Sequence, residues 1–162
     1  MDKIMRISII GAGYVGLVTA VGLGTRGHSV VCVDKDSRIV DHLNKGKLTI
    51  YEPGLEELFV DVIAKDRFSA TTSIDAAVSE SELTIIAVGT PNKHGQIDLN
   101  YVCSAAQEIG DALRNKPSYH TVVVKSTVLP GTTESVVLPI LREHSGKDLG
   151  DFGLGFNPEF LR

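Results

Sequence analysis

The sequence is poor in cysteine and in the residue patterns that bind metals. Its two cysteines, Cys32 and Cys103, lie in an apolar run and in a helical stretch, where a thiol is usually a small buried side chain. We therefore expect neither a disulfide nor a reactive nucleophile. The five histidines lack the spacing of zinc ligands, so no metal site is predicted.

Long apolar runs and an excess of basic residues are also missing. No apolar stretch reaches the length of about 18 residues that marks a membrane-spanning helix, and the opening residues MDKIMR lack the apolar region of a signal peptide. The formal net charge is -4. These absences argue against nucleic acid or a membrane as a partner, and they predict a soluble, cytoplasmic protein.

The residues that are present suit one globular domain. The chain has 162 residues, 43% of them hydrophobic, which is enough to build a full core. No internal repeat or low-complexity linker interrupts it, so we place no domain boundary inside and assign residues 1–162 to one domain.

Short apolar runs alternate with helical patterns along the whole chain. Near-uniformly apolar strands separated by helices indicate a parallel sheet that helices cover on both faces. The sequence therefore predicts an α/β fold with a doubly wound, mainly parallel six-stranded sheet of the Rossmann type, in the strand order 3-2-1-4-5-6. The expected strands span residues 5–10, 29–34, 67–70, 83–88, 121–125 and 152–156, and the expected helices span residues 14–26, 38–45, 55–65, 74–78, 99–114 and 132–144.

Some helix residues carry expectations of their own. Ser37 and Asp98 are expected to cap the helices that follow them. Pro139 lies inside the helix at 132–144 and is expected to kink it. Gly22 and Gly24 each disfavour a helix by about 1 kcal/mol relative to Ala, so we expect close packing against a neighbour at both positions.

Gly11, Gly13 and Gly16 form a G-x-G-x-x-G motif. Alone this motif is weak evidence, but here it closes a strand, opens a helix and precedes an acidic residue, Asp34, at the end of the next strand. Gly11 permits the tight turn, Gly13 lets the backbone approach a pyrophosphate, and Gly16 lets the helix pack close to the sheet. The helix N-terminus offers its N–H groups and partial positive charge to the phosphates.

Asp34 is placed to bind the hydroxyls of the adenosine ribose and to repel a 2′-phosphate, which favours NAD over NADP. Lys35 would moderate that repulsion. The alternative is a plain tight turn beside a solvated strand end, although all parts of the motif occur together. The cofactor-binding residues predicted in this half of the chain are Gly11, Gly13, Tyr14, Val15, Gly16, Asp34 and Lys35.

Ligands of open α/β sheets bind outside the carboxyl ends of the strands, so the other strand ends are informative. The fourth strand ends at Gly89, Thr90 and Pro91, which form either a plain turn or a cofactor contact. The hydroxyls of Ser126 and Thr127, after the fifth strand, either cap local backbone groups or face the nicotinamide end of the cofactor. We expect Lys125 to be structural.

After the sixth strand, Asn157 and Pro158 force the chain from an extended course into a turn. Glu159 is therefore expected just beyond the sheet edge, on the ligand side. The alternative is an exposed turn carboxylate.

Together these stretches resemble the nucleoside-diphosphate-sugar 6-dehydrogenases, the family of UDP-glucose and GDP-mannose dehydrogenases. The glycine loop is shared by many dehydrogenases, whereas STVLPGT and NPEFLR are much more specific. The matching stretches are GAGYVGL at 11–17, EPGLEEL at 52–58, VGTP at 88–91, KSTVLPGT at 125–132 and NPEFLR at 157–162.

The resemblance implies an NAD-dependent oxidation of a sugar C6 alcohol to a carboxylate. Thr127 would position a catalytic water and Glu159 would act in acid/base chemistry around thioester hydrolysis, with Thr90 and Ser126 along the cofactor. The family's central dimerisation helix, nucleotide-sugar domain and catalytic cysteine are expected beyond position 162. We therefore expect a homodimeric full-length enzyme, and NAD binding without sugar oxidation by this chain alone.

Several alternatives remain open from the sequence. UDP-glucose is the first choice of substrate and GDP-mannose the second. Two further interpretations are the NAD domain of another β-hydroxyacid-type dehydrogenase and a non-catalytic nucleotide-sensing module, which needs only the glycine loop and Asp34. No role is assigned to residues 51–58.

Overall fold

A computed structural model of the chain describes residues 3–93 and 95–159. Its centre is a six-stranded sheet in the order β3-β2-β1-β4-β7-β8, and every pair of neighbours is parallel. The predicted fold class and strand order are confirmed. The strands are β1 (Arg6–Ile10), β2 (Ser29–Val33), β3 (Phe68–Thr71), β4 (Leu83–Ile86), β7 (His120–Val124) and β8 (Phe152–Phe156).

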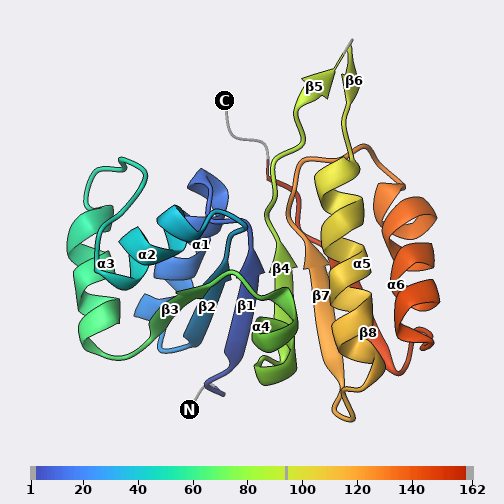
Figure 1. Ribbon diagram of the computed structural model, residues 1–162, viewed down its shortest axis with the longest axis horizontal. Helices are drawn as coiled ribbons and strands as arrows, with labels where there is room; N and C mark the ends of the chain where they lie inside the picture. Colours follow the sequence, from blue (N-terminus) through green and yellow to red (C-terminus); the bar gives the residue numbers. More distant parts are fainter. Residues whose placement is uncertain (1–2, 94, 160–162) are drawn as a thin grey trace.

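Helices cover both faces of this sheet, and each face has its own apolar core (Figure 1). Ile9 belongs to the core under α1 and α3, whereas the next residue, Ile10, belongs to the core under α4, α5 and α6. This alternation explains why the strands are apolar throughout. The helices are α1 (Tyr14–Thr25), α2 (Ser37–Asn44), α3 (Leu55–Ala64), α4 (Ile74–Glu80), α5 (Asn100–Arg114) and α6 (Leu138–Ser145).

The structure corrects the expected cap of α2 and shows the surroundings of Pro139. The N-cap of α2 is Asp36, not Ser37, because the Asp36 side chain accepts the N–H of Arg38. Pro139 lies at the start of α6, which continues directly from a π-helical turn at Thr133–Val137, so the proline does lie inside one helical stretch. The chain therefore adjusts its helical pitch before the proline.

The two glycines inside α1 also differ from one another. A Cβ built on Gly24 would lie 3.0 Å from Cγ1 of Val62 in α3, so close packing explains this glycine. A Cβ on Gly22 would meet no atom within 4 Å, so the expectation of close packing at Gly22 is wrong.

A small antiparallel hairpin of β5 (Asn92–Lys93) and β6 (Gln96–Ile97) was not predicted. Figure 1 shows it projecting beyond the edge at which the parallel strands end. Asp98 follows it and accepts the N–H of Asn100 at 2.9 Å, so its carboxylate binds the first turn of α5, although the N-cap residue is Leu99 and not Asp98. Within the described residues, no helix is long and apolar enough to cross a membrane.

Candidate cofactor-binding site

The glycine loop is locked between β4 and its own helix. Gly11 has a φ of 107°, and a Cβ there would lie 2.6 Å from the carbonyl oxygen of Ala87. A Cβ on Gly16 would lie 1.9 Å from the carbonyl oxygen of Gly11. Only glycine fits these two positions, whereas Gly13 faces open space with no atom within 4 Å of a built Cβ. The backbone at Gly13 is thus open to a ligand.

The N-terminus of α1 points its first N–H groups toward this opening. Gly13 is the N-cap, no side chain caps the helix, and the first turn has no acidic residue. The first N–H groups of a helix have no partner within the helix and carry a partial positive charge. This end of α1 has the donors and the charge to hold a pyrophosphate.

Asp34 lies directly beneath the loop and its carboxylate is held by two backbone groups. One oxygen accepts the N–H of Ala12 at 3.1 Å, and the other accepts the N–H of Asp36 at 3.0 Å. An ionised carboxylate has about four acceptor positions, so two remain for the hydroxyls of a ribose. The orientation of Asp34 is therefore fixed before any ligand binds.

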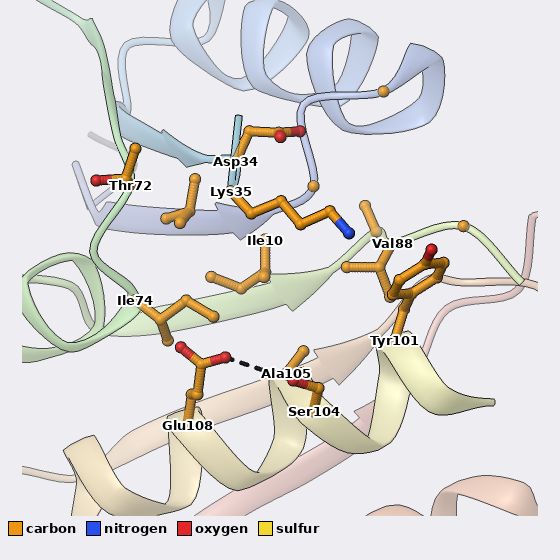
Figure 2. Close-up of a pocket in the computed structure, with 15 residues that line it drawn as sticks. Ile10, Asp34, Lys35, Thr72, Ile74, Val88, Tyr101, Ser104, Ala105 and Glu108 are labelled. Atoms are coloured by element: carbon orange, nitrogen blue, oxygen red, sulfur yellow. Dashed lines mark hydrogen bonds between the residues drawn. The ribbon is translucent and has the colours of Figure 1, made fainter. Parts of the chain in front are cut away.

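These groups open into a pocket of about 410 Å³ between the sheet edge and α5 (Figure 2). Its walls are mainly apolar, which suits a planar base, and its polar groups sit at the margins. The lining residues are Ile10, Gly11, Gly13, Val33, Asp34, Lys35, Thr72, Ile74, Ala87, Val88, Gly89, Tyr101, Ser104, Ala105 and Glu108.

Lys35 spans the mouth of the pocket. Its ammonium lies 4.6 Å from the centre of the Tyr101 ring on α5, a cation–π contact that connects the end of β2 to α5. Figure 2 shows the Lys35 side chain extending over Ile10 toward Tyr101. Lys35 was predicted near the cofactor, whereas Tyr101 was missed.

The α5 and β3 sides of the pocket were not recognised in the sequence. Tyr101, Ser104 and Glu108 follow one another at helical spacing on α5, and Thr72 follows β3. Their only signal is polar or aromatic character on the face of a helix that packs beside the sheet edge. That signal becomes readable once the strand order places α5 opposite the glycine loop.

Cys32 lies behind the loop and is fully buried. Burial raises the pKa of its thiol to about 12, and the nearby Asp34 carboxylate adds to the rise. Such a thiol stays protonated and is not a nucleophile at neutral pH. Cys103 is partly exposed on α5 and does not line the pocket; both cysteines are unpaired.

A second group of predicted residues meets beyond β7 and β8. The hydroxyl of Thr90 donates to the carbonyl of Thr127 at 2.8 Å, and the hydroxyl of Thr127 donates to the carbonyl of Glu159 at 3.0 Å. Lys125 lies 3.4 Å from a carboxylate oxygen of Glu159 and donates to Asn157 at 2.9 Å. Thr90, Thr127 and Glu159 are thus connected by hydrogen bonds at one sheet edge.

Ser126 uses its hydroxyl inside the fold. It is 4% exposed and donates to the carbonyl of Val88 at 2.7 Å, so it joins the ends of β4 and β7. This is the local-capping alternative that the sequence left open.

Several predicted cofactor residues do not line the pocket. Besides Ser126 and Thr127 they are Tyr14, Val15, Gly16, Thr90 and Pro91. The last three residues of NPEFLR, 160–162, lie outside the described residues.

Known proteins are similar to this chain over nearly its whole length. Relatives include GDP-mannose 6-dehydrogenase of Azotobacter vinelandii, 51% identical over 98% of this chain, and UDP-glucose 6-dehydrogenase AglM of Haloferax volcanii, 46% identical over 98%. The chain spans 37% of the length of each.

Solved structures agree with the sequence relatives. The ternary complex of GDP-mannose dehydrogenase from Pseudomonas aeruginosa superposes with a TM-score of 0.94 at 52% identity, covering 98% of this chain and 37% of that one. The UDP-glucose dehydrogenase of Pyrobaculum islandicum gives 0.93 at 45% identity, over 99% and 37%. Residues 5–162 match the family described as "UDP-glucose/GDP-mannose dehydrogenase family, NAD binding domain". The chain belongs to this family, as its NAD-binding domain.

Proposed function

We propose that this chain holds NAD for a nucleotide-sugar 6-dehydrogenase. The observation that carries the proposal is the fixed carboxylate of Asp34 beside an uncapped helix N-terminus, both opening into one pocket. In this proposal the backbone of residues 11–16, including Tyr14 and Val15, receives the pyrophosphate. Asp34 receives the adenosine ribose, and the base lies between the sheet edge and α5.

The nicotinamide end is proposed to lie along the carboxyl ends of β4 and β7. Gly89 lines the pocket there, and Thr90, Pro91 and Thr127 continue the same edge. Ser126 supports this edge through its bond to Val88 rather than by direct contact. When bound, NAD supplies the hydride acceptor for oxidation of the sugar C6 carbon.

Thr127 and Glu159 are the residues we propose for proton transfer and water positioning. Their direct hydrogen bond supports this pairing, because it holds the Glu159 backbone against the end of β7. The Glu159 carboxylate would then accept a proton from water, and the Thr127 hydroxyl would help orient that water. The ammonium of Lys125 forms an ion pair with this carboxylate at 3.4 Å, which helps to hold the carboxylate at this edge.

The identities favour GDP-mannose over UDP-glucose as the substrate. Relatives named GDP-mannose 6-dehydrogenase are 51–52% identical to this chain, whereas those named UDP-glucose 6-dehydrogenase are 44–46% identical. This order reverses the expectation from sequence motifs alone. We propose GDP-mannose as the first substrate to test.

The covalent chemistry is proposed to lie outside residues 1–162. Cys32 is too deeply buried to attack a substrate, and Cys103 does not line the pocket. The nucleotide-sugar domain and the dimerisation helix implied by the family resemblance would lie in the remaining length of a longer protein. Two unpaired cysteines agree with a reducing, cytoplasmic location.

Calorimetry and an NADH assay test the proposal together. We expect the chain to bind NAD with a measurable Kd, to bind NADP more weakly, and to form no NADH with GDP-mannose or UDP-glucose. Absence of NAD binding would contradict the proposal that this pocket binds NAD. Sugar-dependent NADH formation by this chain alone would contradict the proposal that the covalent chemistry lies outside residues 1–162.

A further inference from the structure

The segment between α2 and α3 reaches the phosphate-binding end of α1. It carries YEPGLEEL at positions 51–58, for which the proposed function has no use. The phenol of Tyr14, the first residue of α1, donates a hydrogen bond to the carboxylate of Glu52, 38 positions along the chain. This contact connects the glycine loop to an element that does not line the pocket.

The position of Glu52 is set by the turn that follows it. Gly54 adopts a φ of 79° as the N-cap of α3, a left-handed conformation that suits glycine. The N–H of Leu55 donates to the carbonyl of Glu52 at 3.1 Å, and the Leu55 side chain is buried in the core. Because Leu55 anchors this turn through its N–H group and its buried side chain, the position of the half-buried Glu52 carboxylate is restricted.

A second contact holds α1 against α3 near its other end. Gly24 packs so closely on Val62 that an added Cβ would lie 3.0 Å from the valine side chain. With Tyr14 bound to Glu52 at its first turn, α1 is held by α3 and the turn before it near both ends. The direction in which its first N–H groups point is therefore set by these contacts.

The Tyr14 phenol remains a hydrogen-bond donor at neutral pH. Its bond to Glu52 raises the pKa of Tyr14 above the ordinary value of 10.0. Glu56 and Glu57, in the first turn of α3, are exposed, so Glu52 is the carboxylate that the turn directs at α1.

From these contacts we infer that Glu52 is a positioning residue for the cofactor. Acting through Tyr14, it holds the first turn of α1 in the orientation that receives the pyrophosphate. The inference rests on the proposed binding of the pyrophosphate at residues 11–16. In this role the EPGLEEL segment braces the phosphate-binding helix from outside the pocket.

Calorimetry with NAD, ADP-ribose and adenosine tests this role, because only the first two carry a pyrophosphate. We expect Tyr14→Phe and Glu52→Ala each to weaken binding of NAD and ADP-ribose about five- to tenfold, the range of one lost hydrogen bond. The double variant should lose no more than either single one, since both remove the same contact. Glu52→Gln keeps an acceptor oxygen and should restore binding, and adenosine should bind all variants equally.

Matched controls separate this role from general destabilisation. Tyr51→Phe makes the same change at the neighbouring exposed tyrosine, and Glu56→Gln removes a nearby charge; both should bind NAD as the wild type does. If Glu52→Ala does not fold, Tyr14→Phe carries the test.

The outcomes that overturn the inference differ from those that overturn the proposed function. Equal NAD affinity of wild type, Tyr14→Phe and Glu52→Ala would refute the inference, as would additive losses or an equal loss for adenosine. Failure of the wild type to bind NAD would refute the proposed function itself.

Discussion

Among single residues, Asp34 is the one that we expect to decide between NAD and NADP. Both of its oxygens are oriented by backbone N–H groups, so a ribose would meet them in a fixed geometry. Asp34→Asn removes the charge and one acceptor oxygen. We expect it to weaken NAD binding at least about tenfold, the worth of a charged hydrogen bond, and to narrow the preference for NAD over NADP. Calorimetry with both dinucleotides measures the change.

Asp41→Asn, on the exposed surface of α2, removes the same charge away from the pocket and serves as the control. An Asp34→Asn variant that kept the wild-type preference would show that another group excludes the 2′-phosphate.

His120 makes stability depend on pH in the acidic range. It is 1% exposed, its Nδ1 lies 3.2 Å from the Ser81 carbonyl and its Nε2 lies 2.7 Å from the Thr84 hydroxyl. Burial, with help from the Lys116 charge, lowers the pKa of His120 from 6.5 to about 4. The unfolded chain therefore binds the proton more readily, so stability is full above pH 6.5 and is lost as the pH falls toward 4.

The loss contributed by His120 should reach about 3 kcal/mol, from the size of the pKa shift. Urea titrations between pH 7 and 4 measure it. His120→Gln should flatten the pH dependence, whereas replacing the exposed His42 by Gln should leave it unchanged. Equal slopes for the wild type and His120→Gln would disprove the assignment.

The residues that could be predicted are those whose type is dictated by the backbone. Gly11 and Gly16 follow from steric necessity, and Asp34 follows from its place at a strand end. Tyr101, Ser104 and Glu108 could not be predicted, because their sequence shows only that they lie on a helix. The role of Ser126 could not be predicted for a different reason. A hydroxyl at a strand end can form a hydrogen bond with a backbone group or with a ligand equally well.

At the scale of elements, α1 offers two glycines with opposite expected responses to a methyl group. Gly16→Ala would place a Cβ 1.9 Å from the Gly11 carbonyl oxygen, so we expect a loss of at least about 3 kcal/mol in stability, together with loss of NAD binding. Gly22→Ala meets no neighbour and should stabilise the fold by about 0.5–1 kcal/mol, because Ala favours the helix. Guanidinium unfolding of both variants measures the difference.

Because the two substitutions are expected to change the free energy of unfolding in opposite directions, Gly22→Ala is the control for Gly16→Ala. Destabilisation by Gly22→Ala would mean that the helix backbone is strained at that point.

The regular elements were predictable because apolar runs mark the strands and apolar residues at helical spacing mark the helices between them. The π-helical turn before α6 and the β5–β6 hairpin were not, because each is only a few residues long and depends on neighbouring contacts. For the hairpin, the ion pair between Lys93 and Asp98 joins its first strand to the start of α5. Such pairs leave no periodic signal in a sequence.

For the whole molecule, cofactor binding should raise thermal stability. A ligand that binds only the folded state stabilises it by about 2.7 kcal/mol at a hundredfold excess over its Kd. For a domain of this size that corresponds to a rise in Tm of about 5–10 °C. Differential scanning fluorimetry with NAD measures it, and the shift should shrink for Asp34→Asn at the same NAD concentration. An unchanged Tm at saturating NAD would contradict binding to the folded state.

The pairing of β1 with β4 has a consequence for how the chain folds. Ser8 and Thr84 share a hydrogen bond across this pair although they are 76 positions apart in the sequence, so a long loop must close before the two strands meet. Closure of such a loop costs chain entropy, and contacts within each half of the chain do not offset that cost. We therefore expect the pairing of β1 with β4 to form late in folding. Gly11, directly after β1, packs on Ala87, directly after β4. We therefore expect a growing chain to gain its affinity for NAD only after the two halves of the sheet have joined.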